Sequence, residues 1–511
     1  MNNENLNGNS EDESIRPLEN AVRVAQVIDP LSNNQIQHTK KLGEDFFKDL
    51  ILKSIPKESQ ITNIRFEGPY VALYTLNPKF SLTELTYYLS SLSKNVKKRF
   101  VVRTDPSIRL SEEETRSAVI KMLPSKVTIS AVFCDDATGE VVLEVNHPES
   151  VDANMVITIA QATGWIAHTL RSPHIQSSSM NIIHSTQKGS AKERSLFLQS
   201  LGKRVFRPPV VLESEGLNLN YTNQSNKKKS EYTELKSKVR NREEILIFCL
   251  GGVKQVGRSC FIVVTSESKI MLDCGINPGE PLGISGYPRL DWFNFNLDEI
   301  DAVVISHAHI DHQGFLPTLF KFGYKGPVYC TEPTLPLMTL LQYDSVKISK
   351  SNGTFLPYET RDVNEVIKHC ITLPYGKPTD ISPDITITFN NAGHIMGSAT
   401  VHINIFGTHN ILYSGDYKYA RTQLLDSAVS VYPRVETLIT ESTYGNSGDI
   451  MPDQSLVYKT FTDAINRTLT AGGKVLIPVP AVGRAQEIML FLDKEMREGR
   501  LMEAPVFIEG M

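Results

Sequence analysis

The chain has 511 residues, of which 41% are hydrophobic and 22% charged, and its formal net charge is −4. This length allows several domains, each with its own core, and the composition is typical of globular proteins. The net charge does not indicate a general polyanion-binding surface, so nucleic acid would have to meet local basic patches or bound metals. No apolar run approaches the ~20 residues of a membrane helix, so no membrane partner is expected.

The N-terminal segment is polar and acidic and lacks the apolar stretch of a secretory signal. Residues 1–37 as a whole are predicted to form a disordered tail. The six cysteines include no CxxC pair, which indicates reduced thiols rather than a disulfide framework. Together these features predict a cytoplasmic protein.

Two blocks, residues 38–108 and 109–208, repeat one order of predicted elements: helix, strand, strand, helix, strand. These elements are predicted at 42–54, 61–66, 70–76, 82–93 and a strand ending at 103, and then at 112–122, 127–133, 140–145, 155–162 and 165–171. Such blocks resemble KH domains, which clamp single-stranded RNA with a GxxG loop. Neither block has GxxG at the expected place (76–79 and 149–154). Residual RNA contact and a structural or dimer-spacing role both stay open.

A basic stretch follows the last predicted strand of the second block, and we predict that its Lys203 and Arg204 contact RNA. The alternative is a solvated helix face. Residues 209–243 are polar and include three consecutive lysines at 227–229, which indicates a flexible linker. Beyond the linker, short apolar runs alternate with helical patterns, which predicts a layered α/β domain.

The densest chemical signal is the segment 307–312, which reads His-Ala-His-Ile-Asp-His and follows an apolar run. Imidazole and carboxylate are the usual zinc ligands. In an extended backbone His307 and His309 face the same way, while Asp311 and His312 enter the next turn. One strand end could therefore supply ligands to two adjacent metal ions. The alternative is a polar loop with coincidental histidines.

Four further candidates, Asp273, His394, Asp416 and Glu441, lie at the ends of predicted strands or among small residues. Acidic and imidazole groups repeated at strand ends are how an α/β scaffold builds a site on one rim. Taken singly, Asp273 or Asp416 could cap a turn, and His394 could be a core histidine. Their order around segment 307–312 favours a shared site.

The HxHxDH segment, a later Gly-His and a strand-end Asp together resemble the metallo-β-lactamase family. Three further segments, 251–259, 441–445 and 483–487, narrow the resemblance to β-CASP nucleases of the cleavage and polyadenylation specificity factor type. Two KH-like blocks ahead of a nuclease resemble the archaeal branch. The implied fold is α/β with an α+β N-terminal part: two KH-like domains, a metallo-β-lactamase αββα sandwich (244–447) and the start of a β-CASP insertion (448–511).

The resemblance also implies roles for individual residues. One zinc ion would be held by His307, His309 and His394, and a second by Asp311 and His312, with Asp416 bridging the two. Asp273 would be a supporting residue that orders the rim. The catalytic set implied in this way is Asp311, Glu441 and Asp273, with Glu441 orienting a general-acid histidine. Arg484 would contact RNA.

The implied reaction is zinc-dependent cleavage of single-stranded RNA, as an endonuclease and/or a 5′-3′ exonuclease, in RNA 3′-end processing or transcription termination. RNA polymerase or other transcription machinery and a second copy of the chain are the further partners implied. Two alternatives stay open: a catalytically inactive RNA-processing scaffold, and another lactamase-fold hydrolase. Segments 441–444 and 483–484 disfavour the small-molecule hydrolases of that fold, and its DNA-repair branch usually carries a different acid-containing motif there.

The sequence departs from the family pattern in two places. It stops at Met511 and no histidine follows His409. The family's general acid, a further ligand of the second zinc and the rest of the β-CASP domain are therefore expected to lie outside this sequence, which we interpret as C-terminally incomplete. Pro480 stands where the family usually has an aromatic residue, and we expect only a local effect.

Overall fold

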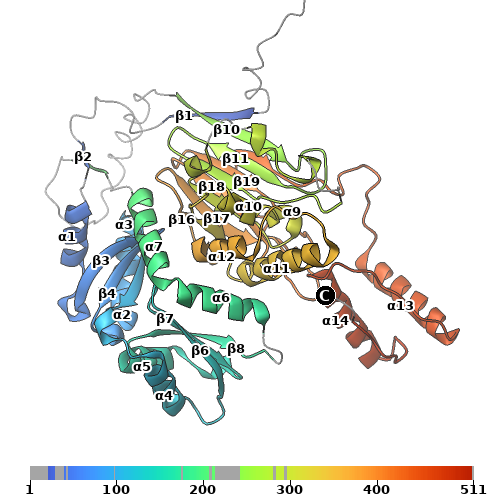
Figure 1. Cartoon of the computed structure of the whole chain (residues 1–511), viewed down its shortest axis with the longest axis horizontal. Helices are drawn as coiled ribbons and strands as arrows, with labels where there is room; N and C mark the ends of the chain where they lie inside the picture. The colour runs from blue at the N-terminus through green and yellow to red at the C-terminus, as the bar shows by residue number, and fades with distance from the viewer. Residues whose placement is uncertain are drawn as a thin grey trace, which may run out of the picture.

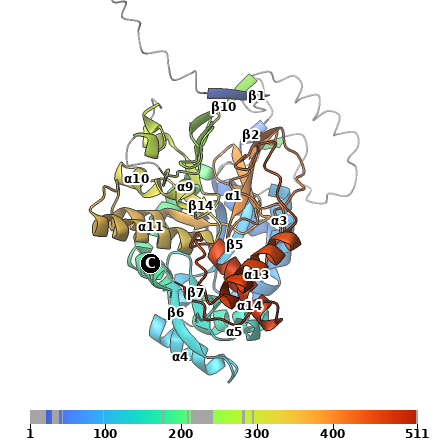
Figure 2. The same cartoon turned by 90° about the vertical axis from the view of Figure 1, so that its right-hand side faces the viewer.

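The computed structural model describes residues 21–28, 39–41, 44–96, 98–173, 177–206, 210–212, 242–279, 284–292 and 296–508. Figure 1 shows two small N-terminal α/β units, a larger two-sheet sandwich and a C-terminal helical pair. The N-terminal units lie on one side of the sandwich, as the turned view in Figure 2 also shows.

The first N-terminal unit packs two long helices against a three-stranded sheet. Its elements are α1 (Glu44–Ser54), β3 (Ile61–Glu67), β4 (Tyr70–Thr75), α2 (Pro78–Thr83), α3 (Leu85–Val96) and β5 (Arg99–Thr104). Strand β4 pairs antiparallel with β3 and parallel with β5. Helix α2 begins where Asn77 accepts a hydrogen bond from the Phe80 N–H and Pro78 occupies the first turn. The place predicted for a GxxG loop is therefore a capped helix start.

The second unit repeats this connectivity, as the sequence predicted. Its elements are α4 (Glu112–Met122), β6 (Ile129–Asp135), β7 (Glu140–Val145), α5 (Ala153–Thr163) and β8 (Ile166–Arg171). Strand β7 pairs antiparallel with β6 and parallel with β8. Val141 and Leu143 are fully buried against Val119 of α4 and Ile159 of α5. Each unit thus has its own apolar core.

A buried arginine joins the two units. Arg103 of β5 is only 4% exposed, and its Nε donates to Glu67 Oε2 at 2.7 Å. From the second unit, the Thr138 carbonyl accepts from Arg103 Nη1, and Glu140 Oε1 lies 3.5 Å from the same nitrogen. The guanidinium therefore ties both units into one body.

Two helices, α6 (Ser178–Gly189) and α7 (Ala191–Val205), lead from the second unit to the sandwich (Figure 1). The Leu198 carbonyl of α7 accepts from the Gly68 N–H at 2.7 Å. On its other side, α7 presents Arg204, which donates to the Asp301 carbonyl at 2.7 Å. Lys98 adds an ion pair of 2.7 Å to Asp380 of the sandwich. These contacts set the N-terminal units against the sandwich.

The sandwich consists of a seven-stranded and a five-stranded sheet. The first has the order β1-β10-β11-β12-β13-β14-β15, with β1 (Ala21–Ile28), β10 (Arg242–Gly251), β11 (Cys260–Val264), β12 (Lys269–Leu272), β13 (Ala302–Val304), β14 (Val328–Cys330) and β15 (Cys370–Thr372). The second runs in sequence order, with β16 (Thr379–Asp380), β17 (Ile385–Asn391), β18 (Ala399–Ile405), β19 (His409–Tyr413) and β20 (Thr437–Ile439). Strands β12 to β15 are parallel.

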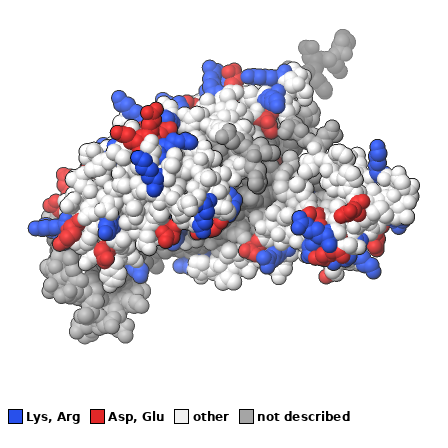
Figure 3. Space-filling model, turned by 90° about the horizontal axis from the view of Figure 1, so that it is seen from below, with Lys and Arg blue, Asp and Glu red and all other residues white. Residues whose placement is uncertain are grey.

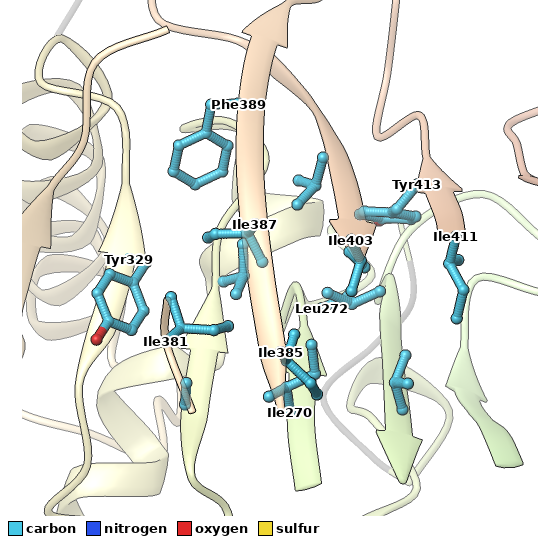
Figure 4. Packing of buried hydrophobic residues seen from close by; sticks show 14 of the residues in the cluster. Ile270, Leu272, Tyr329, Ile381, Ile385, Ile387, Phe389, Ile403, Ile411 and Tyr413 are labelled. Atoms are coloured by element: carbon cyan, nitrogen blue, oxygen red, sulfur yellow. The ribbon is translucent and has the colours of Figure 1, made fainter. Parts of the chain in front are cut away.

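The main core lies between the two sheets (Figure 4). On β17, Ile385, Ile387 and Phe389 alternate with less buried residues, because successive side chains of a strand point to opposite faces. They meet Ile270 and Leu272 of β12. This closely packed apolar core fixes the position of one sheet relative to the other, and with it the position of the strand ends.

Helices cover the outer face of the seven-stranded sheet. They are α9 (Ile310–Gln313), α10 (Leu316–Lys321), α11 (Thr334–Asn352) and α12 (Thr360–His369). Leu316, Met338 and Val366 pack there against Met271 and Val328 of the strands. On the other sheet, segment 429–436 crosses the outer face, where the Arg434 carbonyl lies 2.8 Å from His402 Nε2.

The C-terminal part forms a separate helical pair, α13 (Gln454–Thr470) and α14 (Arg484–Arg497), with a small core of its own around Phe491 and Leu492. It projects from the side of the sandwich (Figure 1). Among the described residues, the structure contains no helix with the length and apolarity needed to cross a bilayer.

Two segments differ from the prediction of irregular chain. Within the expected tail 1–37, residues 21–28 form β1, which pairs antiparallel with β10. Within the expected linker 209–243, residues 210–212 form β9 (Val210–Leu212), paired with β2 (Thr39–Lys41). The letters AVRVAQVI and VVL are rich in β-branched residues, and an edge strand such as β10 offers unpaired backbone groups. Most of the remaining tail and linker, including lysines 227–229, lies outside the described residues.

Candidate metal centre

The predicted ligands gather at one rim of the sandwich. Asp273 follows β12 and His307 follows β13, and these strands are parallel, so their carboxyl ends share an edge. His394, between β17 and β18, and Asp416, after β19, reach the same rim from the other sheet. Two potential metal-binding groups result, one of His307, His309, His394 and Asp416 and one of Asp311, His312 and Asp416.

In the first group, ring nitrogens converge on one another. His309 Nδ1 lies 3.1 Å from His307 Nε2 and 3.1 Å from His394 Nε2. The second nitrogen of His307, Nδ1, faces Ser306 Oγ at 3.0 Å, and that hydroxyl donates to Asp273. His307 therefore carries its proton on Nδ1 and turns the Nε2 lone pair toward the other rings. Lone pairs that face each other at this separation fit a shared cation.

Asp416 connects this group to the second. Its Oδ2 lies 3.5 Å from His394 Nε2 and 3.9 Å from His307 Nε2. Its Oδ1 lies 3.2 Å from His312 Nε2, which in turn is 3.7 Å from Asp311 Oδ2. One carboxylate thus offers an oxygen to each group, the arrangement expected of a bridging ligand.

Asp273 is fully buried and orients the ligands without lying in either group. Its Oδ2 accepts from His312 Nδ1 at 2.7 Å, from Ser306 Oγ at 2.7 Å and from the Tyr413 hydroxyl at 2.6 Å. Its Oδ1 accepts from the Ser306 N–H at 2.7 Å. A carboxylate behind an imidazole fixes its tautomer and direction, so His312 presents Nε2 to the centre.

The backbone around Asp273 is unusually tight. Asp273 has a left-handed φ of 56°, a conformation that costs free energy for a residue with a side chain. A Cβ on Gly275 would lie 1.6 Å from the Asp311 carbonyl oxygen. Only glycine allows this approach of the turn after β12 to the ligand segment.

The electrostatics keep most of the imidazoles neutral and Asp416 ionised. Burial lowers the pKa of His307 and His309, and it lowers the pKa of His394 to about 4. Burial would raise the pKa of Asp416, but the adjacent His312 outweighs it and holds that pKa at about 2. Neutral imidazoles and a carboxylate are the donor set of zinc-type metals.

His312 differs from the other imidazoles. Burial would lower its pKa, but the carboxylates of Asp273 and Asp416 outweigh burial and raise that pKa well above 6.5. A positive charge at Nε2, whether a proton or a metal, is therefore favoured there.

Two other predicted residues lie near the rim. Glu441 accepts from the Tyr417 N–H at 3.1 Å and from Thr443 Oγ1 at 2.6 Å, so it anchors the chain that follows Asp416. Arg484 is exposed at the start of α14. The Val482 backbone contacts His309, and Arg484 is close enough to disfavour protonation of His394.

Lys203 and Arg204 do not join this rim. Both are exposed on α7, and Arg204 bonds Asp301, which precedes β13, whereas His307 follows it. They therefore lie toward the opposite end of the strands from the metal centre.

Sequence reasoning missed two residues of the centre, Ser306 and Tyr413. Both bond Asp273. Ser306 directly precedes the HxHxDH segment, and its place was visible in the sequence. Tyr413 is an apolar-looking strand residue whose partner depends on the pairing of the two sheets.

Comparisons with known proteins agree with this architecture. The profile of the family described as "Transcription termination factor FttA, KH domain" matches residues 44–109, and that of the "Metallo-beta-lactamase superfamily domain" matches residues 262–443.

Several curated relatives carry the name "Transcription termination factor FttA". The protein from Cenarchaeum symbiosum is 44% identical over 90% of this chain and 68% of the relative. The one from Methanothermobacter thermautotrophicus is 40% identical over 91% and 69%. The one from Thermococcus kodakarensis is 39% identical over 91% and 68%.

Proposed function

Because the chain belongs to the family of the archaeal transcription termination factor FttA, we propose that it is a zinc-dependent ribonuclease. Its substrate is single-stranded RNA, and its role is transcription termination or RNA 3′-end processing. The observation that carries the proposal is the pair of donor groups that share Asp416.

The donor set supports zinc as the metal. Three imidazoles with one carboxylate, beside one imidazole with two carboxylates, are nitrogen and oxygen ligands of the kind that zinc binds. When bound, two such ions supply an activated water and positive charge for an in-line attack on a phosphodiester. His307, His309 and His394 would hold one ion, Asp311 and His312 the other, and Asp416 both.

The chain's own residues prepare the site for that chemistry. Asp273 keeps the proton of His312 on Nδ1, so that Nε2 stays available as a donor. Asp416 stays ionised, with its pKa held at about 2, so it can offer one oxygen to each group. Arg484, exposed at the start of α14, offers a guanidinium for a phosphate of the substrate. In this proposal the transcription machinery is the partner that the relatives' name suggests.

The test is cleavage of internally labelled single-stranded RNA by the purified chain with zinc, beside His309→Ala and Phe322→Ala. Phe322→Ala, whose exposed ring lies away from the rim, should cleave RNA at the same rate as the wild type. His309→Ala should lower the rate by roughly a thousandfold or more, because the first group loses a ligand.

A rate in His309→Ala equal to that of the wild type would refute the assignment. Binding of RNA without metal-dependent cleavage would favour the alternative, a catalytically inactive RNA-processing scaffold.

A further inference from the structure

The segment after Asp416 alternates aromatic and cationic side chains. It reads Tyr-Lys-Tyr-Ala-Arg over residues 417–421, which we call the aromatic strip. Tyr419 is 82% exposed and Tyr417 is 42% exposed. The Arg421 side chain is 80% exposed, and its Nε lies 3.3 Å from Asp426 Oδ1. An ion pair as exposed as this one is weak, so a phosphate can compete for the guanidinium. A tyrosine as exposed as Tyr419 adds little to the protein core. Aromatic rings stack on bases and cations pair with phosphates, so this alternation suits a single nucleic-acid strand.

Hydrogen bonds hold the backbone of the strip against Glu441 and against the loop that carries His394. The Tyr417 N–H donates to Glu441 Oε1 at 3.1 Å. The Lys418 N–H donates to the Ala392 carbonyl at 2.8 Å, and the Lys418 carbonyl accepts from the Ala428 N–H at 2.9 Å. Ala392 lies two residues before His394. The side chains of the strip therefore project from a fixed position beside the centre.

The start of α14 lies on the same side. The Glu487 carboxylate accepts from the backbone N–H groups of Gln423 and Leu424, at 2.5 Å and 3.3 Å, and so binds the loop that continues the strip. Arg484, one turn before Glu487, is thereby brought to this edge. Figure 3 shows Lys and Arg interspersed with Asp and Glu on the face seen from below.

We propose that Tyr419 is a positioning residue that stacks on a base of single-stranded RNA beside the metal centre, with Arg421 pairing to a phosphate of the same strand. This inference rests on the proposed ribonuclease function and names the part of the chain that selects the strand. Stacking needs an unpaired base, so the strip favours single strands over duplexes, in which the base faces are covered. Because every base has a flat face, the strip accepts any sequence.

The experiment is a fluorescence-anisotropy titration of the full chain with a short labelled uridine oligomer, with a chelator present so that no cleavage occurs. A matched series of oligomers lacks the base at one position at a time. The variants are Tyr419→Ala, Tyr419→Phe and Phe322→Ala. Phe322 is a suitable control because it is 68% exposed. It precedes β14 and so lies toward the end of the strands opposite the metal centre.

We expect Tyr419→Ala to raise the Kd by about 5- to 100-fold, the effect of one lost stacking contact. Removal of the base at one position should weaken the wild type by a similar factor and leave Tyr419→Ala unaffected, since the two changes remove the same contact. Tyr419→Phe and Phe322→Ala should bind as the wild type does.

Equal affinity of Tyr419→Ala and the wild type for the intact oligomer would overturn the proposal. So would base-removal effects that are the same in both proteins at every position. The titration needs no metal and no turnover. Cleavage by the zinc-loaded wild type is measured separately, so its outcome leaves the stacking result to stand by itself.

Discussion

Two regions of the molecule bury a charged side chain, and they use it differently. Asp273 lies under the metal centre, fully buried, with four hydrogen bonds from residues that precede or form the rim. Arg103 lies between the two KH-like units, 4% exposed, and bonds groups of both. Burial of a charge is therefore not by itself a mark of a functional site. What differs is the partner: Asp273 orients an imidazole whose other nitrogen faces a donor cluster, whereas every recorded partner of Arg103 is structural.

The largest effect on stability should come from Arg103→Met. Glu67 is 2% exposed, and without Arg103 it would be a buried carboxylate whose one remaining side-chain donor among the described residues is the Tyr74 hydroxyl. Such loss of one partner costs about 3–5 kcal/mol. Urea denaturation followed by Trp165 fluorescence, in a Trp292→Phe background, measures it.

The double variant Arg103→Met with Glu67→Gln sharpens this result. It removes the isolated charge, so it should lose less stability than Arg103→Met alone. Zinc content should match that of the wild type in both. A loss of zinc from Arg103→Met would contradict the view that Arg103 is purely structural and only Asp273 supports the metal centre.

A smaller effect, on metal affinity, is expected from Asp273→Asn. The amide cannot hold His312 Nδ1–H as a carboxylate does, so the affinity for zinc should fall by about 10–100-fold, the usual effect of such supporting partners. Competition with a chelating dye measures it. Asp384→Asn is the matched control, since Asp384 is a 6% exposed carboxylate that accepts from Ser268 and Ser382 away from the rim. Equal losses in the two variants would mean that the fall reflects general destabilisation.

The smallest effect should follow Lys98→Ala. Its ion pair with Asp380 joins the first KH-like unit to the sandwich, and the two side chains are 15% and 25% exposed. Partly solvated pairs contribute about 0.2–1 kcal/mol, and salt screens them. We expect a small drop in the free energy of unfolding that shrinks as salt is added. A drop as large as that of Arg103→Met would show that the Lys98–Asp380 ion pair contributes as much to stability as the buried Arg103–Glu67 pair does.

The sequence was most informative where chemistry and periodicity coincided. The duplicated order of helices and strands was predictable from apolar spacing, and the clustering of His and Asp side chains at one rim from residue types at strand ends. Tyr413 was not, because its contact with Asp273 requires the two sheets to face each other. Arg204 stays a predicted RNA contact, but the charge pattern did not show that its guanidinium also donates to the Asp301 carbonyl. Strand β1 was missed because its partner, β10, is more than 200 residues away in the chain.

In the proposed site, Asp416 joins two metal positions into one centre. Anomalous diffraction at the zinc edge, from crystals of the wild-type chain grown with zinc, tests this arrangement. We expect two peaks ~3.5–4 Å apart, one among His307, His309 and His394 and one beside Asp311 and His312, with Asp416 between them. A single peak, or peaks away from this rim, would contradict it.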